Sequence, residues 1–351
     1  MINMRTLLVA GGAGFIGSNF IRHILAKYKN LKVVNLDSLT YSGNLDNLKD
    51  VANDKRYAFV KGDIADKQVI EKVFKKLEPD YVINFAAETH VDKSIHVGAK
   101  EFIDTNITGV FNLLEEVKKY KTSVKKYVQV STDEVYGSLN LDSKQEFKET
   151  TPFSPNVPYA ATKAGGDLLC NAYFKTWQVP VIVTHCSNNY GPYQYPEKLI
   201  PFFVLRMIEG KTLPMYGDGK NVRDWIYVLD HCRALELCLF KGISGEVYNI
   251  GADNELNNLE IADLILKHFK RDKTTLEFIS DRPGHDRRYA IDASKIKKEL
   301  GWKPVYKFEK VFMETIEWYL NNPKWIEAVR KRTGVFNPHI DLWRAHKIKN
   351  K

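Results

Sequence analysis

Short apolar runs alternate with amphipathic stretches along the first half of the chain. The apolar runs lie at residues 6–10, 31–36, 57–64, 81–87, 126–130 and 180–186. Most of the intervening segments carry apolar residues at helical spacing, as residues 67–77 and 100–120 do. Runs of this length predict buried parallel strands, and the segments between them predict crossover helices. The pattern therefore predicts an α/β fold built on a doubly wound, Rossmann-type parallel sheet.

The alternation weakens after residue 190. There the sequence predicts a turn at 213–219, strands at 223–228 and 245–251, and helices at 198–209, 230–240 and 259–269. We expect a sheet domain over residues 1–190, to which some later segments return. A smaller mixed α/β domain is expected over residues 191–320, and a peripheral tail over residues 321–351.

A glycine-rich turn, Gly-Gly-Ala-Gly-Phe-Ile-Gly-Ser, follows the first apolar run and precedes a predicted helix. Two registers fit: GxGxxG at Gly12, Gly14 and Gly17, and GxxGxxG at Gly11, Gly14 and Gly17. Glycines let a pyrophosphate approach the backbone, and a helix N-terminus offers it free N–H groups. Asp37 ends the second predicted strand, where an acid binds ribose hydroxyls and disfavours a 2′-phosphate. The first domain is therefore predicted to bind NAD.

Thr132, Asp133 and Glu134 follow the fifth apolar run after a single serine, Ser131. Their position predicts that they lie at the carboxyl edge of the sheet, where open α/β folds bind ligands. Two adjacent carboxylates in a partly dry cleft raise each other's pKa, so that one tends to stay protonated. The pair therefore predicts one general acid and one general base.

Tyr159 and Lys163 lie one turn apart on a helix predicted at 159–177. An ammonium beside a phenol lowers the pKa of the phenol and makes tyrosine a usable base. The same spacing occurs at four other places in the chain, so it carries little weight alone. We single out this pair because its helix follows the strand that carries Thr132. His90, beside Asp92, is expected to be structural rather than catalytic.

Composition narrows the class of protein only modestly. The formal net charge is +9, but the lysines are scattered along amphipathic segments and predict a solvated surface rather than a nucleic-acid interface. No stretch approaches the roughly 20 apolar residues of a membrane span, and the start lacks a signal-peptide pattern, which predicts a cytoplasmic protein without membrane contact. Four cysteines without metal-ligand spacing predict buried thiols and no metal site. The basic loop 281–289 is either a phosphate clamp or solvated surface.

The motifs together resemble those of dTDP-glucose 4,6-dehydratases, a family within the extended short-chain dehydrogenase/reductase superfamily, from the first strand to about residue 320. The resemblance rests on GGAGFIGS, FAAETHVDKS, VSTDEVYG, PYAATK, SNNYGPYQYPEKLIP, LPMYGDG, RDWIYVLDH and DRPGHDRRYAID. The deciding feature is the acid pair, because sugar epimerases of the superfamily carry small or hydroxyl residues in place of Asp133 and Glu134.

The resemblance implies a lyase reaction driven by internal redox chemistry. Tyr159, activated by Lys163 and aided by Thr132, takes the proton of the sugar O4 while hydride passes from carbon 4 to NAD. Glu134 then removes the carbon 5 proton, Asp133 protonates the leaving hydroxyl of carbon 6, and hydride returns to carbon 6. The product is a 4-keto-6-deoxy sugar for deoxysugar biosynthesis, such as that of rhamnose.

The resemblance also implies two binding sites and a partner, with residues 191–320 as the nucleotide-sugar-binding domain. NAD would be held by Gly11, Gly14, Phe15, Ile16, Gly17, Asp37, Ser38, Leu39, Thr40, Asp63, Ile64, Phe85, Ala86, Ala87, Glu88, Thr105, Tyr159, Lys163 and Asn189. The nucleotide-sugar would be held by Thr89, Thr132, Asn188, Lys198, Leu199, Pro214, Met215, Tyr216, Arg223, Asn258, Asp281, Arg282, Pro283, Gly284 and His285. The partner is a second copy of the chain, with helices at 100–120 and 159–177 forming a four-helix bundle.

Two other classes remain open. The first is another nucleotide-sugar enzyme of the superfamily: a CDP- or UDP-glucose 4,6-dehydratase, or a UDP-sugar decarboxylase or epimerase. The acid pair and the PEKLIP segment argue against a decarboxylase or epimerase. The second is a non-catalytic NAD- or RNA-binding protein, which the positive charge suggests. Such a protein would not need all five predicted catalytic residues.

Overall fold

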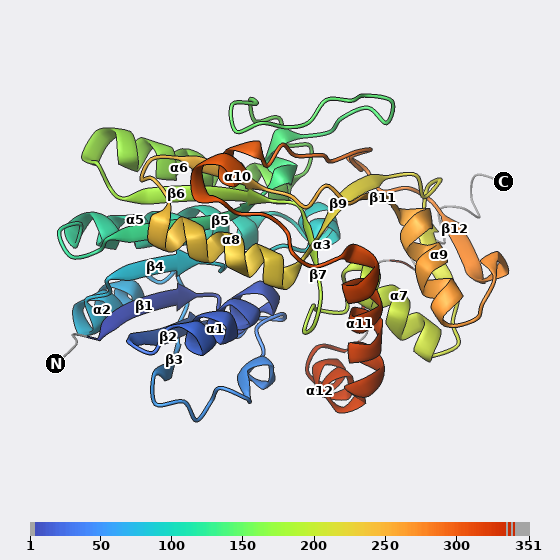
Figure 1. Ribbon diagram of the computed structural model, residues 1–351, viewed down its shortest axis with the longest axis horizontal. Helices are drawn as coiled ribbons and strands as arrows, with labels where there is room; N and C mark the ends of the chain where they lie inside the picture. The colour runs from blue at the N-terminus through green and yellow to red at the C-terminus, as the bar shows by residue number, and fades with distance from the viewer. Residues whose placement is uncertain (1–3, 335, 338–339, 341–351) are drawn as a thin grey trace.

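A seven-stranded parallel sheet forms the centre of the computed structural model, which describes residues 4–334, 336–337 and 340 (Figure 1). The strand order is β10-β6-β5-β4-β1-β2-β3. The strands are β1 (Arg5–Ala10), β2 (Leu31–Asp37), β3 (Tyr57–Lys61), β4 (Tyr81–Asn84), β5 (Lys126–Thr132), β6 (Val181–Cys186) and β10 (Val247–Ile250). The order reverses between β1 and β4, so the predicted doubly wound sheet is confirmed.

Helices cover both faces of this sheet (Figure 1). One face carries α1 (Phe15–Lys27), α8 (Val228–Lys241) and α10 (Ser294–Leu300), and the other carries α2 (Lys67–Leu77), α5 (Val110–Lys119) and α6 (Pro158–Trp177). The alternation of side chains along β1 links the two layers, because Leu7 and Val9 pack into one core and Leu8 into the other. A strand buried on both faces must be apolar throughout, as the sequence pattern indicated.

Two strands end earlier than predicted. β3 stops at Lys61 and β4 at Asn84, so residues 62–64 and 85–87 are loops at the carboxyl edge. Asn84 contributes to the early end of β4, since its side-chain oxygen accepts the backbone N–H of Ala86 (3.0 Å). Side-chain capture of a backbone donor competes with the strand ladder and turns the chain.

The single helix predicted at 100–120 has a π-helical segment in its middle. It consists of α4 (Lys100–Ile103), the π turns η2 (Asp104–Gly109) and α5. Within the π segment, Asn106 accepts the backbone N–H of Glu88 and donates to Thr162 Oγ1, both at 3.0 Å. Such bulges occur often at functional sites, and this one ties α4–α5 to α6 and to the loop after β4.

The second half builds two small sheets beside the large one (Figure 1). One contains β7 (Asn188–Tyr190), β9 (Val222–Tyr227) and β11 (Glu255–Asn257), and the other contains β8 (Leu213–Tyr216) and β12 (Leu276–Ile279). α7 (Leu199–Ile208) and α9 (Asn258–His268) lie among them. The predicted turn at 213–219 is wrong over 213–216, because β8 pairs in parallel with distant β12. β10, α8 and α10 return to the large sheet, whereas the domain boundary at 190 stays a prediction.

The C-terminal part contains α11 (Phe308–Asn321) and α12 (Pro323–Thr333). Trp325, Ile326 and Val329 of α12 are buried in the main core, so the expected peripheral tail is wrong for this helix. Within the predicted tail, residues 335, 338–339 and 341–351 lie outside the described residues. The remaining helical elements are α3 (Val91–His96), η1 (Leu45–Leu48), η3 (Asp133–Tyr136) and η4 (Lys273–Thr275). Across the described ranges, no helix has the length and apolar character needed to span a membrane.

Candidate active site

The glycine turn forms the floor of a cavity at the carboxyl edge of β1 and β2. Gly11 has a φ of +75°, and a Cβ at this position would overlap the backbone of Ala86 in the loop after β4. A Cβ on Gly17 would overlap the carbonyl of Gly11. Gly11, Gly14 and Gly17 line the cavity. The structure therefore favours the GxxGxxG register, in which Gly12 only packs against Asn35 and Ile21.

Asp37 and the loop after β2 form one wall of this cavity. The Asp37 carboxylate accepts the backbone N–H groups of Ala13 (2.9 Å) and Leu39 (2.8 Å). Burial raises the pKa of Asp37, and these two hydrogen bonds oppose the rise. A carboxylate has about four acceptor sites, so two remain for ligand hydroxyls. The first helical N–H groups of α1 have no side-chain cap and also face the turn.

Eighteen of the nineteen predicted cofactor residues line this cavity and its continuation along β5. They are Gly11, Gly14, Phe15, Ile16, Gly17, Asp37, Ser38, Thr40, Asp63, Ile64, Phe85, Ala86, Ala87, Glu88, Thr105, Tyr159, Lys163 and Asn189. Leu39 is the exception, because it lines only a neighbouring cavity, with a φ of +57°. Uncapped N–H groups, a glycine floor and an acid with free acceptor sites fit a dinucleotide.

The five predicted catalytic residues line one continuous cavity beside the glycine turn. Thr132 ends β5, Asp133 and Glu134 begin η3, and Tyr159 and Lys163 lie in the first turns of α6. Thr132 caps the short helix, because its hydroxyl accepts the N–H of Glu134 (3.3 Å) and donates to Asp133 (3.3 Å). The turn after the strand thus projects both acids over the sheet edge.

The two acids have different surroundings. Burial, followed by the charge of Glu134, raises the pKa of Asp133 well above its usual range. Its Oδ2 is buried without a hydrogen-bond partner among the described residues. Burial also raises the pKa of Glu134, but the cations Arg282, Lys198 and Arg223 oppose the rise. Asp133 is therefore the better proton donor, and Glu134 is the acid held closer to its ionised form.

The surroundings of Tyr159 differ from the prediction. Burial and the nearby charges of Glu134, Cys186 and Asp133 raise the pKa of its phenol well above 10, although a hydrogen bond to Thr132 opposes the rise. The ammonium of Lys163 donates to the carbonyl of Val130 (2.8 Å), and burial lowers its pKa. The phenol pKa is therefore raised and not lowered as expected, because burial and the acid pair dominate its surroundings.

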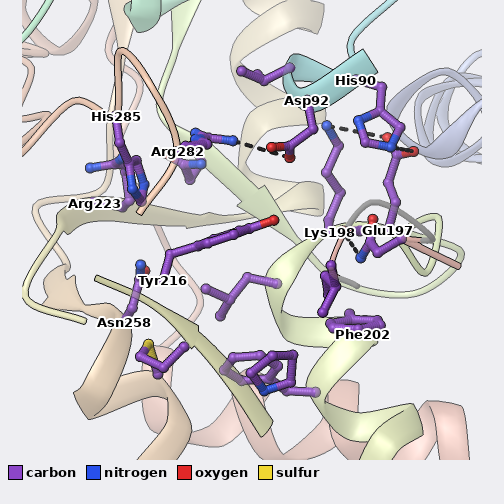
Figure 2. A pocket seen from close by; sticks show the side chains of 18 of the residues that line it. His90, Asp92, Glu197, Lys198, Phe202, Tyr216, Arg223, Asn258, Arg282 and His285 are labelled. Carbon is purple, nitrogen blue, oxygen red and sulfur yellow. Dashed lines mark hydrogen bonds and ion pairs between the residues drawn. The ribbon is translucent and has the colours of Figure 1, made fainter. Parts of the chain in front are cut away.

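A second cavity joins the first at Glu134 and extends into the small sheets (Figure 2). The figure shows Arg223, Arg282 and His285 on one side and His90, Glu197 and Lys198 on the other, with Tyr216 reaching between them. Twelve predicted substrate residues line the two cavities: Thr89, Thr132, Asn188, Lys198, Leu199, Pro214, Met215, Tyr216, Arg223, Asn258, Arg282 and His285. Burial lowers the pKa of His285 to about 4, which keeps its imidazole neutral.

Three predicted substrate residues do not line either cavity: Asp281, Pro283 and Gly284. Asp281 instead holds the imidazole of His285 (2.6 Å), and Gly284 has a φ of +65° against Asn156. They shape the loop that presents Arg282 and His285.

The basic loop supplies a single arginine to the cavity. Arg282 lines it and lies 3.5 Å from Asp92. Arg287 pairs with Asp218 (2.9 Å), and Arg288 pairs with Glu255 (2.6 Å). The phosphate-clamp interpretation of loop 281–289 is therefore wrong for Arg287 and Arg288. Arg223, from β9, is the second cation in the cavity.

Sequence reasoning missed Glu197, which lines both cavities although its side chain is only 5 % exposed. Its carboxylate accepts the Tyr41 hydroxyl (3.2 Å) and lies 3.4 Å from His90 Nε2. His90 also caps α3 by accepting the N–H of Lys93 (3.4 Å), which confirms a structural role. The available signal was an acid two residues before the apolar run of α7.

Known proteins match this chain along most of its length. Residues 8–315 match the family model described as GDP-mannose 4,6 dehydratase. The chain is 47% identical to the dTDP-glucose 4,6-dehydratase of Xanthomonas campestris pv. campestris (strain B100), across 93% of this chain and 96% of that relative. The chain belongs to the dTDP-glucose 4,6-dehydratase family.

Solved structures of dTDP-glucose 4,6-dehydratases share the fold. The enzyme from Bacillus anthracis str. Ames, in complex with NAD, is 50% identical with a TM-score of 0.86, and the match covers 93% of this chain and 99% of that chain. DesIV from Streptomyces venezuelae, with NAD and TYD bound, is 45% identical with a TM-score of 0.88, and the match covers 92% and 99%. The resemblance inferred from the motifs is therefore confirmed.

Proposed function

We propose that the protein is an NAD-dependent hydro-lyase that converts dTDP-glucose into dTDP-4-keto-6-deoxy-glucose for deoxysugar biosynthesis. One observation carries this proposal: a pair of acids, Asp133 and Glu134, lines the same cavity as Tyr159 and Lys163. An oxidation alone would need only Tyr159 and Lys163. An elimination needs both an acid and a base within reach of one substrate.

Binding of NAD rests on the glycine turn, on Asp37 and on the residues after β3 and β4. The N-terminus of α1 would hold the pyrophosphate, and Asp37 would hold the ribose hydroxyls. When bound, NAD accepts hydride from the sugar and returns it, and its nicotinamide charge favours an ionised Tyr159. Lys163 lines the same cavity as Tyr159, and the Val130 carbonyl holds its ammonium in place (2.8 Å).

Tyr159 and Thr132 would handle the proton of the sugar O4. Tyr159 takes this proton when carbon 4 is oxidised, and the hydroxyl of Thr132 positions the phenol. The resulting ketone makes the proton on carbon 5 acidic. Glu134 then removes that proton, because three cations hold it closer to the ionised form.

Asp133 would supply the proton that leaves with water from carbon 6. Burial and the charge of Glu134 raise its pKa, which favours the protonated carboxyl, and its buried Oδ2 has no hydrogen-bond partner among the described residues, so it is available to the leaving hydroxyl. Arg223, Arg282 and Lys198 line the adjoining cavity and would bind the diphosphate of the substrate.

The decisive experiment uses dTDP-glucose deuterated at carbon 4, without added NAD. Mass spectrometry should find a 4-keto-6-deoxy product that carries the deuterium at carbon 6, because the hydride returns within one active site. Parallel reactions with UDP-, GDP- and CDP-glucose test the nucleotide. No dehydrated product with any of the four would sink the proposal, and a faster reaction with CDP- or UDP-glucose would correct its substrate.

We also propose that the protein is a homodimer. Apolar side chains of α4, α5 and α6 are exposed on one surface: Ile103 (46 %), Phe111 (41 %) and Leu168 (57 %). Ile103, Ile107 and Phe111 follow each other at helical spacing, and Ile107 packs near Gly165 of α6. Such a stripe on two neighbouring helices suits pairing with a second copy as a four-helix bundle.

We also propose that the protein works in the cytoplasm. Its four cysteines are buried and free, which suits a reducing compartment.

Light scattering tests the dimer. Phe111→Asp together with Leu168→Asp should halve the molar mass, because two charges would be buried at the interface. Ile208→Asp, at an apolar side chain of α7 with similar exposure (45 %), is the control and should leave the mass unchanged. A parent protein that is monomeric at micromolar concentration would contradict the proposal.

A further inference from the structure

The C-terminal helix α12 contacts the wall of the cofactor cavity from outside. The guanidinium of Arg332 donates to the backbone carbonyls of Tyr41 (2.9 Å) and Gly43. Both carbonyls belong to the loop between β2 and η1, and Ser38, Thr40, Ser42 and Gly43 of this loop line the cavity. A residue almost 300 positions downstream thus holds the loop that follows Asp37.

This loop touches the side chain that is expected to read the cofactor ribose. A Cβ on Gly43 would lie 2.6 Å from the Asp37 carboxylate, so the Gly43 backbone packs directly against it. The backbone N–H of Asn44 donates to the carbonyl of Ala13 in the glycine turn (2.9 Å), and the Ala13 N–H donates to Asp37. The loop position is therefore coupled to the ribose acid and to the phosphate turn.

A second, buried contact runs from α12 to the same turn. The indole N–H of Trp325 donates to Asn47 Oδ1 (2.8 Å), and the side-chain amide of Asn47 donates to the Ala13 carbonyl (2.9 Å). Asn47 is 2 % exposed, and Trp325 is 9 % exposed. Two independent chains of hydrogen bonds thus start on one helix and converge on the peptide groups at Ala13 and Gly43.

We propose that α12 retains the dinucleotide, with Arg332 and Trp325 as positioning residues for the cofactor cavity. The proposal rests on the proposed function in one respect: an enzyme that oxidises and reduces the same substrate molecule must not lose its reduced cofactor between the two steps. Neither side chain needs to touch the ligand. Both act by holding the loop and the turn in the shape that binds it.

The test measures NAD binding, which does not depend on substrate. Arg332→Ala removes two hydrogen bonds to the loop and should raise the dissociation constant for NAD roughly tenfold. Trp325→Phe keeps the aromatic packing, leaves Asn47 Oδ1 unpaired in a buried place, and should have an effect of similar size. The NAD content of the purified variants should fall accordingly.

Lys331→Ala is the matched control. Lys331 lies beside Arg332 on the same helix but pairs only with Glu327 (2.7 Å) among the contacts found in the described residues. This variant should retain NAD as the parent does. Arg332→Lys keeps the charge but loses the fork that reaches two carbonyls, so its dissociation constant should lie between those of parent and alanine variant.

The values of kcat and of the KM for NAD show whether Arg332 and Trp325 position the cofactor cavity or only stabilise the fold. With saturating NAD, both test variants should recover the parent kcat and show only a higher KM for NAD. Unchanged NAD content in Arg332→Ala and Trp325→Phe would overturn the proposal. A fall in kcat that excess NAD does not restore, with a matching fall in melting temperature, would also overturn it. Failure of the dehydration reaction in the parent would not change these binding results.

Discussion

The two cavities that meet at Glu134 are built in different ways. Apart from the residues it shares with the catalytic cleft, the cofactor cavity comes from the first 105 residues, and its floor is largely backbone at the glycine turn. The substrate cavity gathers side chains from at least five separate segments, among them Lys198, Tyr216, Arg223 and Arg282. A ligand with a constant pyrophosphate can be read by backbone N–H groups, whereas a specific sugar nucleotide needs placed side chains.

This difference teaches where mutations should act. Changes in the cofactor cavity should act through backbone shape and should impair both redox steps together. Changes at the acids or in the substrate cavity should act through charge and should separate one step from another. At Glu134, where the two cavities meet, the effects of backbone shape and of charge can be distinguished.

The largest effect on activity is expected for the acid pair, Asp133 and Glu134, where the two cavities meet. Asp133→Asn together with Glu134→Gln should lower the rate of dehydration by at least ~1,000-fold, because the elimination loses both its acid and its base. The same variant should still oxidise carbon 4, which is seen as reduced cofactor by absorbance. The exposed acids Asp142 and Glu146 provide the control, since Asp142→Asn with Glu146→Gln should be neutral. Dehydration at the parent rate would show that our acid and base assignments are wrong.

The next largest effect is a loss of stability when a side chain is added to the glycine turn that forms the floor of the cofactor cavity. Gly11→Ala should lower the free energy of unfolding by roughly 3 kcal/mol, since the new Cβ overlaps the Ala86 backbone and the φ of +75° is strained for alanine. Gly210→Ala, at a φ of +68° with open space around it, should cost only about 1 kcal/mol. Urea denaturation of both variants measures the difference. Equal losses would mean that backbone conformation, and not close packing, demands the glycine.

The smallest effect is a shift in the pH profile of kcat when a cation is removed from the substrate cavity. Arg282 opposes the rise in the pKa of Glu134, so Arg282→Gln should raise that pKa further. Glu134 must be ionised to act as a base, and the acidic limb of the kcat profile should therefore move to higher pH. Arg287→Gln in the same loop removes a cation that pairs with Asp218 and should leave the limb in place. If the acidic limb does not move in Arg282→Gln, Arg282 does not influence the ionisation of Glu134.

The sequence predicted the parts of the site that depend on local pattern. The glycine turn, Asp37 and the acids after β5 stand at the ends of strands, and the order of parallel strands brings such ends to one edge. The motifs also carried a family resemblance over most of the chain, from which the substrate residues came. The predictions that were wrong concerned segments whose structure depends on contacts distant in sequence. β8 is a strand because it pairs with β12, and α12 is not peripheral because Trp325 packs in the main core.

The amino-acid sequence by itself determined the sheet, the dinucleotide turn and the identity of the reacting groups. These follow from periodicity and from residue type, which are local properties. Only the tertiary structure decided the proton affinities, because burial depends on everything packed around a group. It raised the pKa of the Tyr159 phenol against the sequence expectation, and it set cations beside Glu134 but left Asp133 Oδ2 buried and unpaired among the described residues. It alone also brought α12 against the loop that closes the cofactor cavity.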